Sequence, residues 1–382
     1  MIYSIPYSLL VIFLGILAML LHQRRDDQDF CYKLKIVGVS VYFVFFAFRG
    51  FIFTDWLTYY IEFDNVNIDL LLHYELGKSR EPLFLILMLI TKGIINDFHF
   101  FIFICTAINT WLLITFFRKY TDNIFICLVL YLVFEGFGIS INLMRNSIAI
   151  FIFLNAIEHL EKRQPLQYFG MCLMAVGFHF SAFIYIPLYF FFHRKMNKWG
   201  YLTILVLCNA VFIFHIPIFM RLISLFGIGG AFLENKIDVY SEIGNRLGFG
   251  MGFIERFITG LLVFLYYDKL NSIRPTNKIF INGLITYFIC SFMFSEFTEI
   301  SKRLAMLFVF SYWIIWGDLI KCFAIKNNRR LFIAYLCVYC LLKTTVTINQ
   351  PVDQYENLLF GKTKSFQERK YIYDRTFEEP KY

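Results

Sequence analysis

The stretch FEGFGISINLMRNSIAIFIFLNAIEHLEKRQPLQYFGMCLMAVGFHFSAFIYIPLYFF, residues 134–191, decides the fold of this chain. It is apolar over most of about sixty residues, enough to pass more than once through a hydrocarbon layer of ~30 Å. Arg145 and His179 nevertheless stand inside it. An ionisable side chain is costly at membrane depth, so residues of this kind are usually paired or functional.

The composition of the whole chain also indicates a membrane protein. Of its 382 residues, 59% are hydrophobic and only 17% are charged, which excludes an ordinary water-soluble domain. The net charge of +8 comes from Lys and Arg in short connectors between apolar runs. That pattern orients membrane helices and does not indicate nucleic-acid binding. We therefore expect a single transmembrane domain over residues 1–349, followed by a polar C-terminal tail over 350–382.

The apolar runs predict an all-α polytopic membrane protein with about ten transmembrane helices. The expected spans are 3–22, 34–53, 98–117, 124–139, 143–160, 200–219, 251–267, 278–295, 303–321 and 331–348.

Two further apolar stretches, 82–95 and 166–192, do not fit a simple series of spans. Basic connectors on the cytoplasmic side require 166–192 to enter and leave from that side, as two short helices meeting near GFHFS. They also require 82–95 to be a half-helix that enters from outside. Re-entrant backbone is tolerated where it lines a protein cavity, so we expect an outward-facing cavity, with outer loops at about 54–81 and 220–250. A single long, tilted span over 166–192 remains an alternative.

The positions of Arg145 and His179 predict that they meet. Arg145 precedes Glu161 by ~24 Å of helix, and His179 follows Pro165 by ~21 Å, at 1.5 Å per residue. Measured from the same cytoplasmic hinge, both side chains reach the outer half of the bilayer.

Other charged residues are expected at the same depth. Arg49 and Arg303 join Arg145, and the carboxylates of Asp55 and Glu81 lie nearby. Several arginines around one outward-facing cavity suggest a phosphate-bearing substrate, because a guanidinium group binds phosphate with a planar fork. The alternative is that these arginines form internal ion pairs with the carboxylates, such as Arg49 with Asp55 or Glu81.

The remaining candidate residues allow two readings each. His179 is either a satisfied core histidine or a group that moves a proton near neutral pH. Trp56 and the tyrosines near it are either interfacial anchors or faces that carry sugar rings. No metal-binding pattern is present: there is no HExxH, no DxD in an outer loop and no closely spaced His/Cys cluster.

Three motifs resemble those of bacterial polysaccharide polymerases of the Wzy/EpsG type. FRGFIFTDWLTYY, residues 48–60, resembles their Arg, Asp and Tyr pattern, and REPLFLILMLI, residues 80–90, resembles their Glu-Pro half-helix. Residues 141–190 resemble their longest and most specific motif. Within it, Met144 and Asn146 replace the usual Ile and Gln around the arginine. Lesser similarities are KIDVY in the large outer loop and ISKRLAMLF before a late span.

The resemblance implies a polymerase of O-antigen or a related surface polysaccharide in the bacterial cytoplasmic (inner) membrane. Its substrate would be an undecaprenyl-diphosphate-linked oligosaccharide repeat unit. It would work on the periplasmic side and move the growing glycan onto a new lipid-linked unit. A chain-length regulator protein is a further implied partner. No cofactor is implied, and arginines in place of a divalent ion would make the enzyme metal-independent.

The resemblance also implies roles for individual residues. The cations that stabilise the lipid diphosphate as it leaves would be Arg145 first, then Arg49 and Arg303. The base that accepts the proton of the attacking hydroxyl would be His179, with Asp55 or Glu81 as the second choice. The aromatic residues that position the sugars would be Trp56, Tyr59 and Tyr240.

Three alternative functions remain open for the sequence. One of them, a non-enzymatic assembly partner, would need none of these charged groups. An O-antigen ligase would use the same donor and similar arginines but would be expected to have a larger outer loop than 220–250. A transporter or flippase of lipid-linked oligosaccharide would be expected to show related halves or a polar path to both faces. Here the functional-looking charges gather on one side.

Overall fold

The computed structural model describes residues 2–75, 80–218, 221 and 250–377. Every regular element in these ranges is a helix, which confirms the all-α class predicted for the described part of the chain. The helices form two compact units that are described separately.

Unit 1 combines the first half of the chain with its C-terminal end, Met1–Tyr189 and Leu331–Tyr382. Its elements are η1 (Ile2–Ser4), α1 (Ile5–Gln23), α2 (Gln28–Ala47), α3 (Trp56–Asn65), α4 (Asp69–Leu72), α5 (Pro82–Ile94), α6 (Phe98–Tyr120), α7 (Ile124–Tyr131), η2 (Leu132–Gly136), α8 (Phe137–Ile141), α9 (Met144–Glu161), α10 (Pro165–Phe178), η3 (Phe180–Tyr185), η4 (Pro351–Asp353) and α21 (Phe366–Phe377).

Unit 2 covers Phe190–Arg330. Its described elements are α12 (Lys198–Ile213), α15 (Met251–Leu265), α16 (Tyr267–Ile273), α17 (Asn277–Met293), α18 (Thr298–Met306) and α19 (Phe310–Cys322). Two helices cross the boundaries between the units, α11 (Leu188–Phe191) and α20 (Lys326–Thr347).

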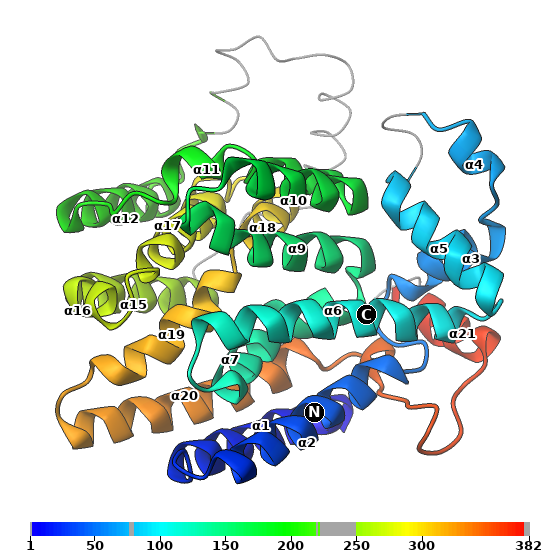
Figure 1. Cartoon of the computed structure of the whole chain (residues 1–382), viewed down its shortest axis with the longest axis horizontal. Coiled ribbons are helices and arrows are strands. Elements are labelled where there is room, and N and C mark those ends of the chain that lie inside the picture. Colours follow the sequence, from blue (N-terminus) through cyan, green and yellow to red (C-terminus); the bar gives the residue numbers. More distant parts are fainter. Residues whose placement is uncertain (1, 76–79, 219–220, 222–249, 378–382) are drawn as a thin grey trace. The chain divides into compact units, whose positions relative to one another are not determined.

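The core of unit 1 is built around α9, which packs against both α6 and α10 (Figure 1). Most of α9 is buried because its apolar side chains point in every direction around the helix. Its few polar groups make hydrogen bonds to the neighbouring helix. Asn109 donates to Ser147 Oγ at 2.9 Å, and Asn155 donates to Leu112 O at 2.9 Å. These bonds fix the register of α9 against α6, since a buried polar group needs its partner.

Several helices expose apolar faces, as expected for helices in contact with lipid. On α20, Leu331, Val338 and Val346 are more than half exposed. Within the described residues, five helices can cross a membrane by length and composition, or six if the bent pair α18 and α19 counts as one span. They are Ile2–Gln23, Gln28–Ala47, Phe98–Tyr120, Ile124–Ile141 and Lys326–Thr347. The expected total of about ten spans is therefore not confirmed in the described residues, because several predicted spans form helices that are shorter or less apolar.

Two spans are interrupted by breaks in the helix. The first break lies between α7 and α8, where Glu135 takes a left-handed backbone conformation with φ of 72°. Such a φ is unfavourable for a residue other than glycine, so the break has an energetic cost. The second lies between α18 and α19, which bend by 63° and divide the stretch expected as one span over 303–321.

The two unusual apolar stretches have the helix boundaries that the sequence predicted. The stretch expected at 82–95 is the 13-residue helix α5, about two thirds of the ~20 residues needed to span a membrane. The stretch 166–192 is divided into α10 and η3, and the division falls at His179, inside GFHFS. The break itself is thus confirmed, whereas re-entry from the cytoplasmic side remains a prediction.

Candidate functional site

The centre of the site is an ion pair between the starts of two helices in unit 1. Pro82 opens α5, which places Glu81 at its N-terminal cap, and Arg145 is the second residue of α9. Arg145 Nη1 donates to Glu81 Oε2 at 2.5 Å, and each side chain is 15% exposed. Because both groups are largely withdrawn from solvent, each neutralises a charge that would otherwise be costly to bury.

Arg145 has further neighbours and one unused donor. Its guanidinium group hydrogen-bonds the hydroxyl of Tyr59 on α3 and lies 6.0 Å from the ring centre of Phe84 on α5. Its Nε is buried and has no hydrogen-bond partner among the residues that the structure describes. A buried donor without a partner is unusual, and it leaves the guanidinium group able to bind one more acceptor.

Glu81 also connects the pair to the break after α10. Its second oxygen, Oε1, accepts the backbone N–H of Phe180 at 3.1 Å. Burial alone would raise the pKa of the Glu81 carboxyl, but the positive charge of Arg145 and the backbone hydrogen bonds outweigh it, so the pKa is lowered. Glu81 is therefore ionised at neutral pH in this arrangement.

A second hydrogen-bonded chain joins the same break to the first turn of α9. His179 Nδ1 accepts the N–H of Ser181 at 3.2 Å and lies 2.7 Å from Ser181 Oγ. Ser181 Oγ is also 3.2 Å from Asn146 Oδ1 and donates to it. Arg145 and His179, which the sequence predicted to meet, thus lie around Glu81.

A tight helix contact supports this arrangement. Gly177, two residues before His179, faces Leu83, two residues after Glu81. A Cβ atom on Gly177 would lie 2.6 Å from Leu83 Cδ1, so only glycine allows α10 to approach α5 this closely. The contact fixes the distance between the His179 break and Glu81.

Asn142 connects the site to the segment between α2 and α3. Its Oδ1 accepts the N–H groups of Thr54 and Asp55 at 3.2 and 3.3 Å, and its Nδ2 donates to Thr54 Oγ1 at 3.1 Å. Thr54 Oγ1 in turn donates to Asp55 Oδ1 at 2.9 Å. Since Asn142 is three residues before Arg145, it places Asp55 close to the start of α9.

Three other candidate residues in unit 1 are buried. Arg49 is 3% exposed and donates to Phe46 O at 2.8 Å, Thr106 Oγ1 at 3.3 Å and Ile141 O at 3.5 Å. Trp56 and Tyr59 are 5% and 6% exposed. In this arrangement the side chain of Arg49 is bound by carbonyl and hydroxyl oxygens, and Glu81 pairs with Arg145 instead.

The remaining candidates belong to unit 2 or lie outside the described residues. Arg303 is exposed on α18 of unit 2, where Glu299 pairs with Lys302 at 3.6 Å. Tyr240 and the KIDVY motif lie outside the described residues. Among the described residues, no group of three or more His, Cys, Asp or Glu side chains is arranged to bind a metal ion.

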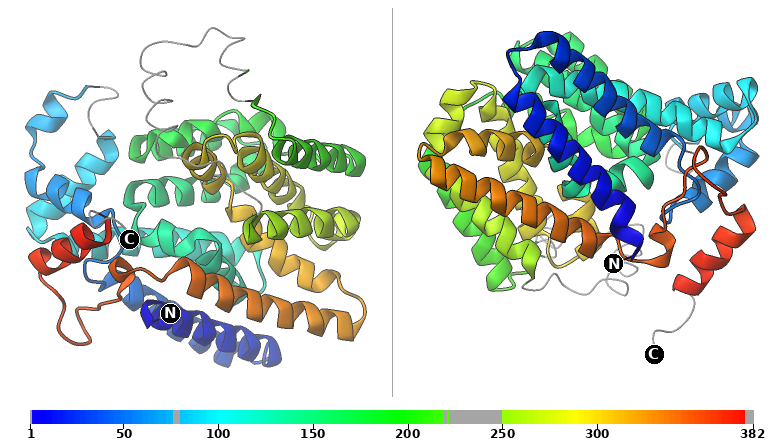
Figure 2. Two further views of the ribbon diagram at one scale, coloured as in Figure 1. Left: turned by 180° about the vertical axis from the view of Figure 1, so that it is seen from behind. Right: turned by 90° about the horizontal axis from the view of Figure 1, so that it is seen from below.

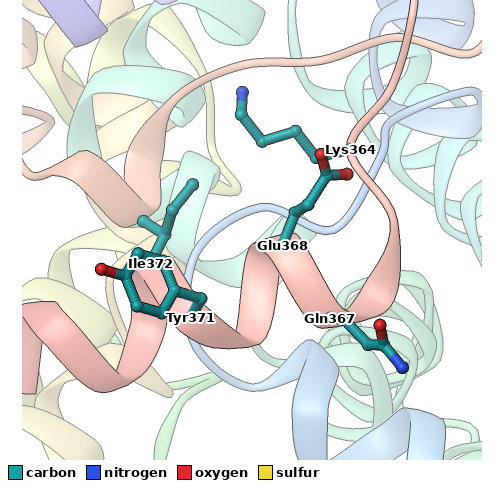
Figure 3. A pocket seen from close by; sticks show the side chains of 5 residues that line it. All are labelled: Lys364, Gln367, Glu368, Tyr371 and Ile372. Atoms are coloured by element: carbon teal, nitrogen blue, oxygen red, sulfur yellow. The ribbon is translucent and has the colours of Figure 1, made fainter.

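The expected cavity around Arg145 remains a prediction. A shallow groove of about 440 Å³ lies on the C-terminal segment and is lined by Lys364, Gln367, Glu368, Tyr371 and Ile372 (Figure 3). A second hollow of about 340 Å³ is formed mainly by the first residues of the chain. Arg145 lines neither of them.

Reasoning from sequence missed Asn142, Ser181 and the pairing of Glu81 with Arg145. Asn142 and Ser181 each lie within three residues of a candidate, and short polar residues next to an unusual charge are a signal that could have found them. The pairing of Glu81 with Arg145 has no local signal, since the two residues are 64 positions apart.

These features define a helical membrane protein with a polar site inside its helical domain. Its helices are apolar, some are broken or short, and a shielded charge cluster lies where helix ends meet. A comparison with protein families matches the EpsG family over residues 34–359. This match covers more than half of the chain, and the protein belongs to the EpsG family. Searches of curated proteins and of solved structures each found no significant match. Membership of the family confirms the resemblance to polysaccharide polymerases.

Proposed function

We propose that this protein polymerises undecaprenyl-diphosphate-linked oligosaccharide repeat units into O-antigen or a related surface polysaccharide. The reaction takes place at the periplasmic face of the bacterial inner membrane. The family match supports the class of reaction. The observation that carries the proposal is Arg145, a shielded arginine. Within the described part of the chain its Nε has no hydrogen-bond partner, and its one paired carboxylate is Glu81.

The proposed reaction exchanges one glycosidic bond for another. A hydroxyl of the terminal sugar on the new lipid-linked unit attacks the anomeric carbon of the growing chain. The bond from that carbon to the phosphate oxygen breaks, and undecaprenyl diphosphate leaves with the bonding electrons. The proton of the hydroxyl passes to a base of the protein. Fixed cations near the diphosphate lower the barrier, because negative charge builds up on the leaving oxygen.

Arg145 is placed to bind this leaving group. A phosphate oxygen can take the unused Nε donor and compete with Glu81 for Nη1, which gives the two-point contact typical of arginine and phosphate. Tyr59 holds the guanidinium group from a third side. Arg49 and Arg303 are proposed as further contacts to diphosphate, and Trp56 and Tyr240 as contacts to sugar.

Glu81 is the better candidate for the base in this arrangement. While it is paired with Arg145 its pKa is lowered, which makes it a weak base. When the diphosphate occupies Arg145, Glu81 loses its cation and its pKa rises, so binding of the substrate creates the base. His179, which lies at the break beside Glu81, is proposed as a hydrogen-bond partner of the substrate. Asp55, placed by Asn142, remains the alternative base.

Purified protein supplied with lipid-linked repeat units tests the proposal. We expect polymer longer than one unit with no other protein present, and the same yield after chelation of divalent cations. Transfer of glycan only to a lipid A core acceptor would identify a ligase. Movement of the lipid-linked unit across a vesicle membrane without a new bond would identify a transporter. A chain-length regulator, the further proposed partner, is expected to narrow the length distribution when it is added.

A further inference from the structure

The C-terminal segment, residues 350–377, pairs with the backbone that carries Arg49 and Asp55. Gly50 N donates to Glu356 O at 3.0 Å, and Leu358 N donates to Phe48 O at 2.7 Å. These bonds form a short antiparallel bridge between Arg49 and Asn357. The segment between α2 and α3 is not helical, so the C-terminal segment supplies hydrogen bonds that its backbone would otherwise lack.

The same segment supports a strained residue. Phe53 has a φ of 64°, a left-handed conformation that is unfavourable for a residue with a bulky side chain. Its N–H donates to Val352 O at 2.9 Å. Strained backbone of this kind persists only where its surroundings enforce it, and Thr54 and Asp55 follow directly.

Aromatic packing adds a second contact between the two segments. Phe366, the first residue of α21, packs against Phe51, Trp56 and Tyr60, with ring centres 6.2, 5.5 and 4.7 Å away. In the left view of Figure 2, seen from behind, the red helix α21 again lies beside the blue helix α3. The C-terminal segment therefore covers the side of α3 that bears Trp56.

A shielded ion pair joins two parts of the C-terminal segment, Glu356 and, on α21, Arg369. Arg369 Nη2 lies 2.9 Å from Glu356 Oε1, and Lys364 Nζ lies 2.7 Å from the same oxygen. The side chains of Arg369 and Glu356 are 2% and 7% exposed. Arg369 Nη2 also donates to Gln354 O at 2.5 Å. Removal of Arg369 leaves the shielded Glu356 carboxylate with the more exposed Lys364 as its remaining cation among the described residues, so we expect α21 to be held less firmly.

We infer that Arg369 and Glu356 are positioning residues for the polymerase site. Their pair docks the C-terminal segment, the docked segment sets the backbone from Arg49 to Asp55, and Asn142 connects that backbone to Arg145. This inference rests on the proposed function, because its main measurement is polymer synthesis.

The test compares Arg369→Met with Lys370→Ala in the full-length protein. Lys370 is the next residue on α21, and its pair with Asp374 at 2.8 Å is exposed, so its removal is a matched control. We expect Arg369→Met to reach normal levels in the membrane, yet to make polymer at least ~10-fold more slowly per folded molecule at saturating substrate, with KM little changed. Lys370→Ala should match the wild type. If Arg369→Met does not accumulate, Arg369→Lys, which keeps a cation for Glu356, is measured in the same way.

Limited trypsin digestion gives a second measurement that does not depend on activity. Undocking of α21 should speed cleavage between residues 362 and 375 in Arg369→Met but not in Lys370→Ala. A normal rate per folded molecule in Arg369→Met, or a loss explained entirely by the amount of protein, would overturn the inference. If the wild type makes no polymer, the proposed function fails. The digestion then tests only whether the pair of Arg369 and Glu356 holds α21 in place. Equal cleavage of both variants would overturn that step.

Discussion

Arg145 and Glu81 are 64 positions apart in the chain and form an ion pair at the meeting point of α5, α9 and the break after α10. Each is provided by the start of a helix, and neither has another fully charged partner among the hydrogen bonds and ion pairs described. The pair therefore represents a resting state in which the protein's own carboxylate occupies the position proposed for the anionic substrate.

Replacement of Arg145 should stop polymerisation without loss of the protein. Loss of one preorganised charge stabiliser typically costs ~10²–10³ in rate, so Arg145→Ala should leave mostly single repeat units. Arg145→Lys keeps the charge but loses the planar fork, so it should be nearly as defective. Blotting of the membrane protein beside a gel of the glycan ladder measures both effects.

Arg80→Ala is the control for this pair of variants. Arg80 is adjacent to Glu81 but pairs with Glu62, and its side chain is 40% exposed, so its removal should leave the ladder normal. A normal ladder from well-expressed Arg145→Ala would contradict the role in diphosphate binding. Long glycan chains together with a reduced level of the protein would indicate that Arg145 stabilises the packing of helices instead.

The stability conferred by Glu81 should depend on pH. Its pKa is lowered in the folded protein, so its contribution is fully present above the ordinary carboxyl pKa of about 4.3 and is lost as pH falls through the folded value. Thermal unfolding of wild type and Glu81→Gln in detergent should differ at pH 7, with the wild type more stable. The difference should disappear on acidification well below pH 4. A difference that stays constant with pH would show that Glu81 is not paired as described.

The close approach of α10 to α5 should be sensitive to side-chain volume. Gly177→Val pushes into Leu83, and overpacking of this kind typically costs about 1–3 kcal/mol. It should also move His179 away from Glu81 and lower the rate of polymerisation. Gly170→Val on the same helix is the control, since a Cβ there meets nothing within 4 Å. Equal activity of the two variants would argue against the contact.

The helix break at Glu135 predicts opposite effects for neighbouring substitutions. Glu135→Gly relieves a φ of 72° and should raise stability by about 1 kcal/mol. Gly136→Ala places a Cβ 2.3 Å from Tyr131 O and should destabilise the protein or straighten the helix. Melting temperatures of the two variants, measured together, test the break. Destabilisation by Glu135→Gly would show that this conformation is not the dominant one.

The topology can be tested with reporters that are active only in the periplasm. The basic residues around Lys195 favour the cytoplasm, so a fusion after Lys195 should be inactive. A fusion after Gly227, which lies outside the described residues, should be active. Activity at Lys195 would rule out re-entry of 166–192 from the cytoplasmic side and favour a single tilted span.

The sequence predicted local features of the site well. Pro82 marked the start of α5, and His179 within GFHFS marked the break after α10, because proline and interrupted apolar runs act on the backbone around them. The common membrane depth of Arg145 and His179, calculated from helix length, stays a prediction. These predictions need only the rise of a helix and the chemistry of nearby residues.

Partners brought together by the fold could not be predicted in the same way. The sequence showed no carboxylate one helical turn from Arg145, but its partner Glu81 comes from another helix. One reading paired Arg49 with Asp55 or Glu81, whereas its guanidinium group donates to carbonyl and hydroxyl oxygens. Hydropathy also did not reveal the 63° bend between α18 and α19, which divides the stretch predicted as one span over 303–321.

The ion pair between Glu356 and Arg369 extends across the end of the family match. Glu356 lies within the matched residues, which end at 359, and Arg369 lies beyond them. A gene trimmed to the family boundary would therefore encode a protein that keeps Glu356 and loses its buried partner Arg369. For expression and for fusion of affinity tags, the shortest intact unit has to reach the end of α21 at Phe377.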